Sequence, residues 1–282
     1  MNVMTASNPL PERAPLGVPV APVLQDRVAL VFGAGSSGPG WGNGKATAVT
    51  FARAGAIVVA IDIDAAAAEQ TRAVIAAEGG RVEAATCDVT NSAQIRALVD
   101  DVAARHGRID VLHNNVCITV MGGILEETEE SFKRVLDINL TSAFLTTKHC
   151  LPHMLKRGKG AIVNVSSIAA IRYSYPYPSY QASKAGLNQL TMSIALQYAK
   201  QGIRANAIMP GMMDTPLIYQ QIVGQYESAE AMRAARAAKT PMGRQGTGWD
   251  IANAALFLAS DAAGYISGVA LPVDGGLTCL AI

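Results

Sequence analysis

The sequence has almost no net charge: 23 Lys and Arg residues stand against 22 Asp and Glu residues, for a formal charge of +1. It therefore lacks the basic surface that holds nucleic acid and the polybasic patch that binds an anionic membrane. It also lacks an uninterrupted apolar stretch of the roughly 18–20 residues that span a bilayer. Residues 1–23 do not show the charged start and apolar run of a signal peptide. These absences favour a small-molecule partner and predict no nucleic acid and no membrane.

Cysteine is scarce, and its spacing gives no sign of a metal site. Cys87, Cys117, Cys150 and Cys279 form no C-x-x-C pair, and no His-rich pattern accompanies them. A tetrahedral zinc site needs such spacing. We therefore expect reduced thiols, a cytoplasmic protein and no metal.

Apolar residues and glycine are plentiful. Hydrophobic residues make up 50% of the chain, which is ample for a buried core and excludes disorder throughout. Glycine accounts for 26 of the 282 residues, above its usual share of about 7%. Prolines concentrate near the start, at Pro9, Pro11, Pro15, Pro19 and Pro22. They predict an extended, poorly ordered N-terminal extension at residues 1–23, followed by one catalytic domain at residues 24–282.

Short apolar runs alternate with stretches of helical period along this domain. The candidate strands are Arg27 to Phe32, Ala56 to Ile61, Arg81 to Thr86, Ile109 to His113, Ala161 to Val165, Ile203 to Ile208 and Val269 to Val273. The candidate helices are Lys45 to Arg53, Ala65 to Ala77, Ala93 to Arg105, Glu130 to Lys156 and Gln181 to Lys200. This alternation predicts an α/β fold, a single-domain Rossmann-type doubly wound parallel sheet of about seven strands with helices on both faces.

A glycine-rich loop follows the first candidate strand. Six of the twelve residues from Gly33 to Gly44 are glycine. A loop of this kind between a strand and a helix lets backbone N–H groups approach a pyrophosphate at the helix N-terminus. The next strand ends at Asp62, whose carboxylate would accept hydrogen bonds from ribose hydroxyls and repel a 2′-phosphate, so the expected cofactor is NAD. The alternative is a flexible loop beside an ordinary surface aspartate.

A second group of residues is suited to proton transfer. Tyr180 and Lys184 stand four apart at the start of a candidate helix and therefore share one face. A cation beside a phenol favours the phenolate, so we expect Lys184 to lower the pKa of Tyr180 toward useful acid/base work. Ser167 stands thirteen residues upstream, at the end of another strand.

Together these motifs resemble the short-chain dehydrogenase/reductase family, in its compact single-domain form, from about residue 24 to the C-terminus. The matching pieces are the glycine-rich turn, Cys87-Asp88-Val89, Asn114-Asn115-Val116, Asn139, Ser167, Tyr180-x-x-x-Lys184, Pro210-Gly211 with Thr215, and Asp274-Gly275-Gly276. Each is weak alone, but their order along the chain is specific.

The resemblance implies a role for each matching residue. Tyr180 would be the acid/base, Ser167 would hold and polarise the substrate oxygen, Lys184 would bind the nicotinamide ribose, and Asn139 would extend a proton relay through its backbone and a water molecule. The alternatives are a helix kink or cap at Asn139 and a backbone-satisfied hydroxyl at Ser167. The implied cofactor-binding residues are Gly33, Ser37, Gly42, Asn43, Gly44, Asp62, Ile63, Asp88, Val89, Asn115, Tyr180, Lys184, Pro210, Gly211, Met213 and Thr215.

The chain departs from the family pattern at three places. The glycine-rich loop is about four residues longer than usual, Cys117 stands where glycine is common, and Leu140-Thr141-Ser142 follows Asn139. None of these changes removes a chemically active group, so the enzyme interpretation holds.

The prediction is an NAD-dependent alcohol dehydrogenase or ketone reductase acting on a secondary alcohol or ketone. Aromatic and flexible apolar residues at 171–178 and 212–226 favour an apolar or ring-containing substrate, although such loops also pack against other subunits. Residues 212–245 read as a substrate lid, with one helix from Gln221 to Lys239. A non-catalytic dinucleotide sensor and a non-redox lyase or dehalogenase on the same fold remain alternatives. The resemblance also implies a homotetramer, assembled through the helix from Gln181 and the apolar tail at residues 277–282.

Overall fold

The computed structural model describes residues 21–172 and 176–280. Residues 1–20 of the proline-rich extension lie outside this part of the chain, so its predicted character stays a prediction. The described residues form one parallel sheet in the order β3-β2-β1-β4-β5-β6-β7. Its strands are β1 (Val28–Phe32), β2 (Ile57–Asp62), β3 (Arg81–Thr86), β4 (Val111–Asn114), β5 (Gly160–Val165), β6 (Ile203–Pro210) and β7 (Ala270–Val273). The predicted doubly wound parallel sheet is confirmed.

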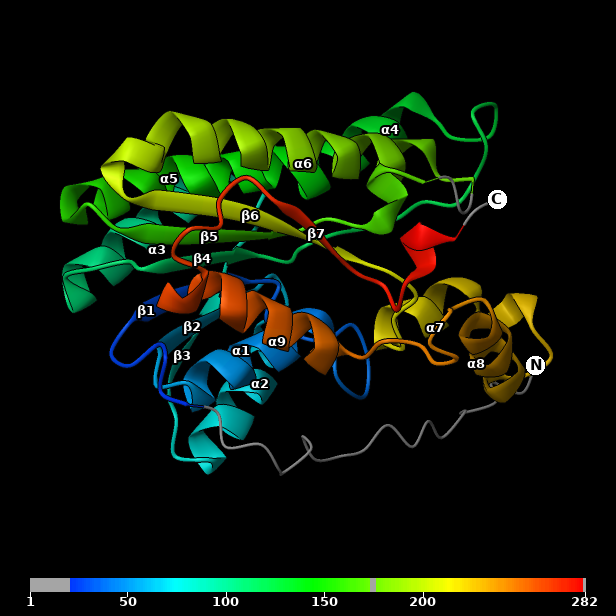
Figure 1. The fold of residues 1–282 in the computed structure, drawn as a ribbon, viewed down its shortest axis with the longest axis horizontal. Coiled ribbons are helices and arrows are strands. Elements are labelled where there is room, and N and C mark those ends of the chain that lie inside the picture. The colour runs from blue at the N-terminus through cyan, green and yellow to red at the C-terminus, as the bar shows by residue number, and fades with distance from the viewer. Residues whose placement is uncertain (1–20, 173–175, 281–282) are drawn as a thin grey trace.

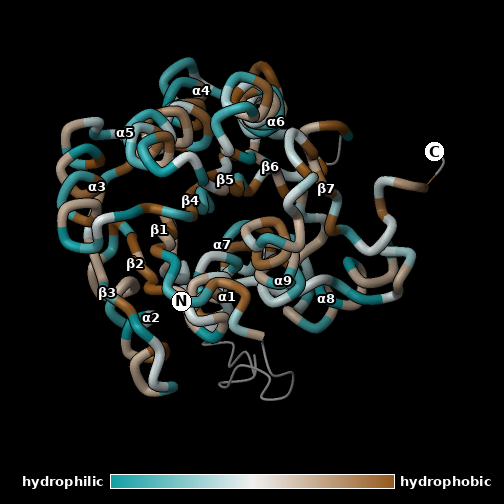
Figure 2. Tube along the Cα trace, turned by 60° about the vertical axis from the view of Figure 1, so that its left-hand side comes forward, coloured by the Kyte–Doolittle hydropathy of each residue, from teal (hydrophilic) through white to brown (hydrophobic). Residues whose placement is uncertain are grey.

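The sheet lies between two layers of helices (Figure 1). On one face lie α1 (Asn43–Arg53), α2 (Ala65–Ala77) and α9 (Gly248–Ala259), and on the other lie α3 (Ser92–His106), α5 (Ser142–Arg157) and α6 (Pro178–Tyr198). Figure 2 shows the apolar strands enclosed by these helices. The strands are nearly continuous in apolar residues because both of their faces are buried.

The strand order reverses at β1, which places the candidate site. From β1 the chain proceeds to β2 and β3 on one side, and β4 then pairs with the other side of β1. In an open parallel sheet, ligands bind at the carboxyl ends of the strands beside such a reversal. The glycine-rich loop begins at this point, directly after Phe32.

The predicted helix Glu130 to Lys156 is interrupted. The structure has α4 (Glu129–Leu136), a five-residue π-helical turn (Asp137–Thr141) and then α5. Asn139, inside the π turn, accepts a hydrogen bond from the backbone N–H of Ile118 at 2.8 Å and donates to its carbonyl at 2.9 Å. The interruption therefore coincides with a bond to a distant segment, which helical periodicity does not reveal.

The lid segment, residues 212–245, is also more broken than predicted. It contains α7 (Pro216–Ile222), a 3₁₀ turn (Val223–Gln225) and α8 (Ala229–Ala238) in place of one helix from Gln221 to Lys239. Ser228 caps α8 by accepting the N–H of Ala231 at 3.1 Å, so a new helix starts there. Other 3₁₀ turns cover Ile168–Ala170, Ala199–Gln201, Asp261–Ala263 and Leu277–Cys279.

Both ends of the lid segment are fastened together. Gly246 donates its N–H to Met212 at 3.0 Å and accepts the N–H of Asp214 at 2.7 Å. Met213 and Gly246 thus form a parallel bridge. Any movement of the lid segment would occur between these two points.

Candidate active site

A cavity of about 540 Å³ lies at the carboxyl ends of the strands, a volume typical of small-molecule sites. Its wall includes fifteen of the residues predicted from the sequence: Gly33, Ser37, Gly42, Asn43, Asp62, Ile63, Asp88, Val89, Asn115, Ser167, Tyr180, Pro210, Gly211, Met213 and Thr215. Gly44, Asn139 and Lys184 do not line it. Residues at or just beyond the ends of six strands, β1 to β6, thus meet in one place.

One end of the cavity is suited to an anion. Helix α1 begins here with Gly42 as its N-cap, and no side chain caps its first N–H groups. Such N–H groups and the helix dipole attract phosphate. The buried Oδ1 atom of Asn43, on the same wall, has no hydrogen-bond partner among the described residues. These backbone donors and the unsatisfied amide fit the pyrophosphate and ribose groups of a dinucleotide.

Gly44 has a packing role and not the expected wall position. A Cβ atom there would lie 1.8 Å from the carbonyl oxygen of Gly33 and 2.6 Å from Nδ2 of Asn115. Only glycine therefore allows α1 to approach the end of β1 this closely. Gly44 is absent from the cavity wall, and its predicted contact with the cofactor stays a prediction.

Asp62 lies at the end of β2, as predicted, and its carboxylate braces the glycine-rich loop. Its Oδ2 accepts the N–H of Gly35 at 2.9 Å and its Oδ1 accepts the N–H of Asp64 at 3.1 Å. A Cβ atom on Gly35 would stand 2.8 Å from Asp62 Oδ2. The loop and the acid are thus packed as one unit at the cavity wall.

Three further predicted residues complete this half of the cavity. Asn115 donates from Nδ2 to the Gly33 carbonyl at 3.0 Å, so it fastens the loop to β4. Asp88 accepts the N–H and the hydroxyl of Thr90, and these bonds hold the pKa of its carboxyl below the usual value. Val89 beside it is buried.

Ser167, Tyr180 and Lys184 meet at the opposite end. Ser167 stands two residues after the end of β5 and accepts the N–H of Ala169 at 3.1 Å, and its hydroxyl also hydrogen-bonds the Tyr180 phenol. Lys184 is buried, with Nζ 5.6 Å from the centroid of the Tyr180 ring and 2.7 Å from the carbonyl oxygen of Val165, to which it donates. The structure therefore brings these three predicted residues together.

The net pKa change of Tyr180 is opposite to the one expected from the sequence. Loss of contact with water raises the pKa of its phenol, and the hydrogen bond from Ser167 acts against that rise. Burial also lowers the pKa of Lys184, whose Nζ is engaged by Val165. In this state Tyr180 holds its proton at neutral pH, which suits a proton donor.

Asn139 is placed behind the cavity. Its side chain bonds both backbone groups of Ile118 and donates to Oγ of Ser183 at 3.1 Å, one residue before Lys184. It therefore joins the π turn, the segment after β4 and α6. A relay through its backbone stays a prediction.

The departures from the family pattern have different outcomes. Cys117 is one of the residues that line the cavity. Leu140 points away, because a Cβ atom on Gly186 of α6 would lie 2.8 Å from its Cδ2 atom. The leucine is thus accommodated by a glycine on the facing helix.

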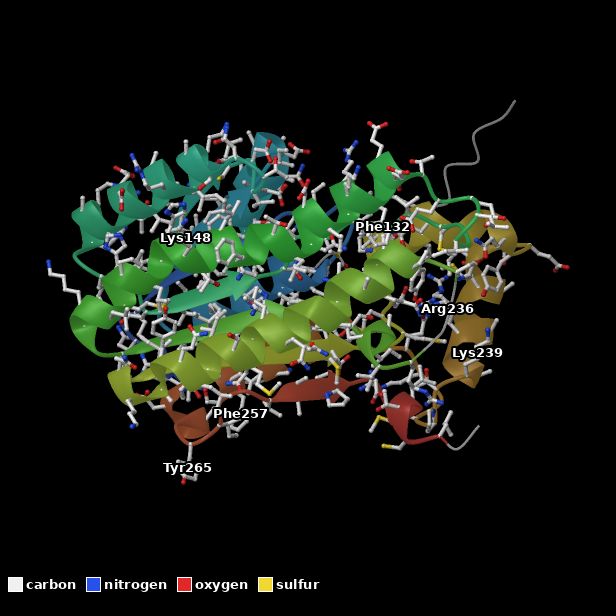
Figure 3. The ribbon with its side chains drawn as sticks, turned by 90° about the horizontal axis from the view of Figure 1, so that it is seen from above. Phe132, Lys148, Arg236, Lys239, Phe257 and Tyr265 are labelled. Carbon is white, nitrogen blue, oxygen red and sulfur yellow. The ribbon has the colours of Figure 1, made fainter. Side chains whose placement is uncertain are left out.

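The cavity also has walls that were not predicted residue by residue. They include Ile118, Thr119, Met121, Arg134, Tyr177, Arg236 and Leu277. Arg236 of α8 is buried and donates from Nε to Oε1 of Gln245, and it lies at the lid end of the molecule (Figure 3). In the sequence, the only sign of a role for Arg236 was its place in an alanine-rich helix. Its partner Gln245 lies nine residues further on, across a turn, so the sequence alone did not reveal their hydrogen bond.

Comparison with known proteins agrees with this site. Among the described residues no group of His, Cys, Asp and Glu could hold a metal ion, and no helix is long and apolar enough to cross a bilayer. Fold and cavity define an α/β dinucleotide-binding protein. The family model described as enoyl-(acyl carrier protein) reductase matches residues 39–278.

The relatives are dehydrogenases and reductases. The chain is 42% identical to cis-4-hydroxycyclohexanecarboxylate dehydrogenase of Sinomonas cyclohexanicum, over 90% of this chain and 98% of the relative. A solved structure from Burkholderia xenovorans, described as a short-chain dehydrogenase/reductase, shares 43% identity with a TM-score of 0.86, covering 92% of this chain and 99% of the other. A Beutenbergia cavernae structure, described as an NAD(P)-dependent gluconate 5-dehydrogenase with NADP at low occupancy, shares 33% identity with a TM-score of 0.83, covering 93% of this chain and all of the other.

The chain belongs to the short-chain dehydrogenase/reductase family. It is an oxidoreductase of the kind that binds a nicotinamide dinucleotide and acts on alcohol or ketone substrates.

Proposed function

We propose that this protein is an NAD-dependent dehydrogenase or reductase that interconverts a secondary alcohol and a ketone, with Tyr180 as the general acid/base. The observation that carries the proposal is the Ser167–Tyr180 hydrogen bond at one end of a cavity whose other end holds Asp62 and the N-terminus of α1. A bound nicotinamide would accept or supply hydride at the substrate carbon.

Residues of the protein would hold the substrate oxygen and transfer its proton. Ser167 donates a hydrogen bond to that oxygen and Tyr180 transfers the proton, as acid in reduction and as base in oxidation. The raised pKa of the phenol favours the acid form, which supports reduction from the free enzyme. Lys184 donates to the Val165 carbonyl with its Nζ 5.6 Å from the centroid of the Tyr180 ring, and its proposed role, as the family resemblance implies, is to bind the nicotinamide ribose.

The acid/base role is tested by Tyr180→Phe. We expect turnover to be abolished while the Kd for NADH, measured by its fluorescence, stays within about twofold. Tyr265→Phe, at a fully exposed tyrosine, is the matched control and should keep wild-type activity. Near-normal turnover by Tyr180→Phe would refute the mechanism.

The preference for NAD over NADP rests on Asp62. The negative charge of Asp62 at the ribose end would repel a 2′-phosphate. Because its carboxylate also accepts the Gly35 N–H, the sharp variant is Asp62→Asn, which keeps an acceptor for that bond and loses the charge. We expect a higher kcat/KM with NAD than with NADP in the wild type, and at least a tenfold loss of that ratio in the variant. Equal kcat/KM values for NAD and NADP in the wild type would show that Asp62 does not set the cofactor preference.

The substrate is proposed to be apolar or ring-containing. The cavity wall carries Ile118, Met121, Tyr177 and Leu277, whose side chains suit an alicyclic or aromatic ring, and Tyr177 packs against Tyr180. The relative from Sinomonas cyclohexanicum is named for a ring-containing secondary alcohol that bears a carboxylate. A screen that pairs cis-4-hydroxycyclohexanecarboxylate with cyclohexanol and with a short linear alcohol tests the ring and the charge separately. Preference for the linear alcohol would reject the ring.

A homotetramer is proposed from the family and from exposed apolar side chains. Met192 and Leu196 are exposed on α6, and Phe257 and Tyr265 are exposed along another side, away from Arg236 at the lid end (Figure 3). Light scattering should give about four times the chain mass. A monomer at micromolar concentration would contradict the proposal.

A further inference from the structure

No side chain at the N-cap position of helix α6, which carries Tyr180, caps the start of that helix. Its N-cap residue, Tyr177, makes no side-chain capping bond, and its first residue is Pro178, which has no N–H. The first N–H of the helix therefore belongs to Ser179, a fully buried residue. This donor requires an acceptor from elsewhere in the chain.

Glu127, 52 residues earlier, provides that acceptor. Its Oε2 accepts the Ser179 N–H at 3.2 Å, and its Oε1 accepts the Ser179 hydroxyl. The same Oε1 accepts the hydroxyl of Ser131 at 3.4 Å, which ties it to the first turn of α4. A carboxylate at a helix N-terminus is favoured by the helix dipole and forms charge-assisted hydrogen bonds.

The segment that carries Glu127 also forms part of the cavity wall. Ile118, Thr119 and Met121 line the cavity, and the N–H of Gly122 donates to the carbonyl of Pro176 at 2.9 Å, just before α6. The segment from 118 to 127 is thus attached to the start of α6 at two points. The position of the first turn of α6 depends on this attachment.

Tyr180 directly follows the capped residue. Its ring also packs edge-on against Tyr177, with 5.0 Å between ring centroids. If the first turn of α6 frayed, the phenol would move relative to Ser167 and to the substrate oxygen, and misplacements of about 1 Å can cost about 100-fold in rate.

We propose that Glu127 is a positioning residue for the reaction: as an external cap of α6 it holds Tyr180 in line with Ser167. The inference rests on the proposed role of Tyr180, which it extends to a residue outside the family motifs. Glu127 touches neither cofactor nor substrate in this scheme, so its effect should fall on kcat.

The test compares Glu127→Ala, which removes the acceptor, with Glu127→Gln, which keeps one carbonyl oxygen for the Ser179 N–H. Glu126→Ala, at the exposed neighbouring glutamate, is the matched control. We expect Glu127→Ala to lower kcat by about 10- to 100-fold, with the Kd and KM for NADH within twofold of wild type. Glu127→Gln should recover most of the loss, and Glu126→Ala should behave as wild type.

Two kinetic results would overturn the proposal. One is an unchanged kcat in Glu127→Ala. The other is equal losses in the Ala and Gln variants accompanied by weaker NADH binding, because that pattern indicates general disruption of the fold. If Glu127→Ala does not fold, Ser179→Ala keeps the N–H and removes the hydroxyl bond to Glu127; kcat should fall about threefold, and no change would count against the cap.

Hydrogen exchange separates this inference from the proposed function. Backbone amides at residues 177–183 should exchange faster in Glu127→Ala than in wild type and Glu127→Gln, measured without substrate or cofactor. Unchanged exchange would refute the cap even if the enzyme is active. Faster exchange with no turnover by the wild type on any alcohol would leave the cap standing and reject the proposed function.

Discussion

Acid should destabilise this protein through one buried histidine, His113 on β4. Its ring is fully buried, packs edge-on to Phe51 at 5.9 Å between centroids, and neither ring nitrogen has a hydrogen-bond partner among the described residues. Burial lowers the pKa of His113 to about 3 from an ordinary 6.5. The folded protein therefore keeps this imidazole neutral where the unfolded chain protonates it.

The sign and size of the effect follow from proton linkage. As pH falls below 6.5 the unfolded state binds a proton that the folded state does not, so stability is present above pH 6.5 and is lost progressively down to about pH 3. Between pH 7 and pH 5 the loss is about 2 kcal/mol, and over the whole window it approaches about 5 kcal/mol. For a chain of this size, 2 kcal/mol corresponds to roughly 4–8 °C in Tm.

The test variant is His113→Leu, which replaces the imidazole with an apolar side chain of similar volume and removes both unpartnered nitrogens. Urea unfolding at fixed protein concentration, at pH 7, 6 and 5, gives the free energy of unfolding for each variant. We expect the variant to be at least as stable as wild type at pH 7 and to lose about 2 kcal/mol less between pH 7 and 5.

The control is His153→Gln, at a partly exposed histidine paired with Asp100 at 3.0 Å. It should not remove the acid-side loss. If wild type and His113→Leu lose the same free energy between pH 7 and pH 5, the folded state must accept the proton, and the assigned burial of a neutral ring is wrong.

Three further predictions concern the frame of the site. Gly44→Ala should prevent folding or cost at least about 3 kcal/mol, read from urea midpoints, because its Cβ would stand 1.8 Å from the Gly33 carbonyl oxygen; normal stability would contradict that packing. Asp110→Ala should cost about 3–5 kcal/mol in the same assay, because the buried Asp110 carboxylate accepts the buried N–H of Val28 at 2.9 Å and two N–H groups of Arg108 at 2.6 Å each; a cost under 1 kcal/mol would count against these bonds. Gln220→Ala should make α7 more sensitive to limited proteolysis, because Gln220 donates to the Ser37 carbonyl and joins the lid segment to the glycine-rich loop; an unchanged cleavage rate would refute the link.

Much of the fold could be read from local pattern. The segment Arg81 to Thr86 has the bounds predicted for it, and the other strands begin and end within two residues of expectation, because buried parallel strands show as short apolar runs between turns. Helix α2 also has its predicted bounds. These signals lie within each segment, so one sequence suffices to find them.

The interruptions could not be read in the same way. The π turn at Asn139 coincides with hydrogen bonds to Ile118, and α7 carries Gln220, which donates to the carbonyl of Ser37 in the glycine-rich loop. Both involve partners distant in sequence, so the helical period continues through them. Ser228, a capping residue before Glu230, was the one local clue to the start of α8.

The site shows the same division. Motifs at strand ends pointed to Asp62 and Ser167, and the spacing to Lys184 pointed to Tyr180. All three line one cavity, because the carboxyl ends of parallel strands meet at one edge, and their roles stay predictions. Glu127 carries no motif, and its bond to Ser179 appears only when two segments are brought together. The glycine at position 44 was predicted from the glycine-rich pattern, and the structure adds that its lack of a side chain lets it pack against Gly33; its contact with a cofactor stays a prediction.

Burial acts on His113, Lys184 and Tyr180 alike, and their partners decide what it produces. It lowers the pKa of both basic groups and raises that of the phenol. Lys184 has the Val165 carbonyl and Tyr180 has the Ser167 hydroxyl, so each group is satisfied in a defined position; neither ring nitrogen of His113 has a partner among the described residues. Desolvation by itself therefore marks no catalytic group. What distinguishes the pair in α6 is that each is fixed by a strand-end partner at the cavity, which is the arrangement that proton transfer to a bound oxygen requires.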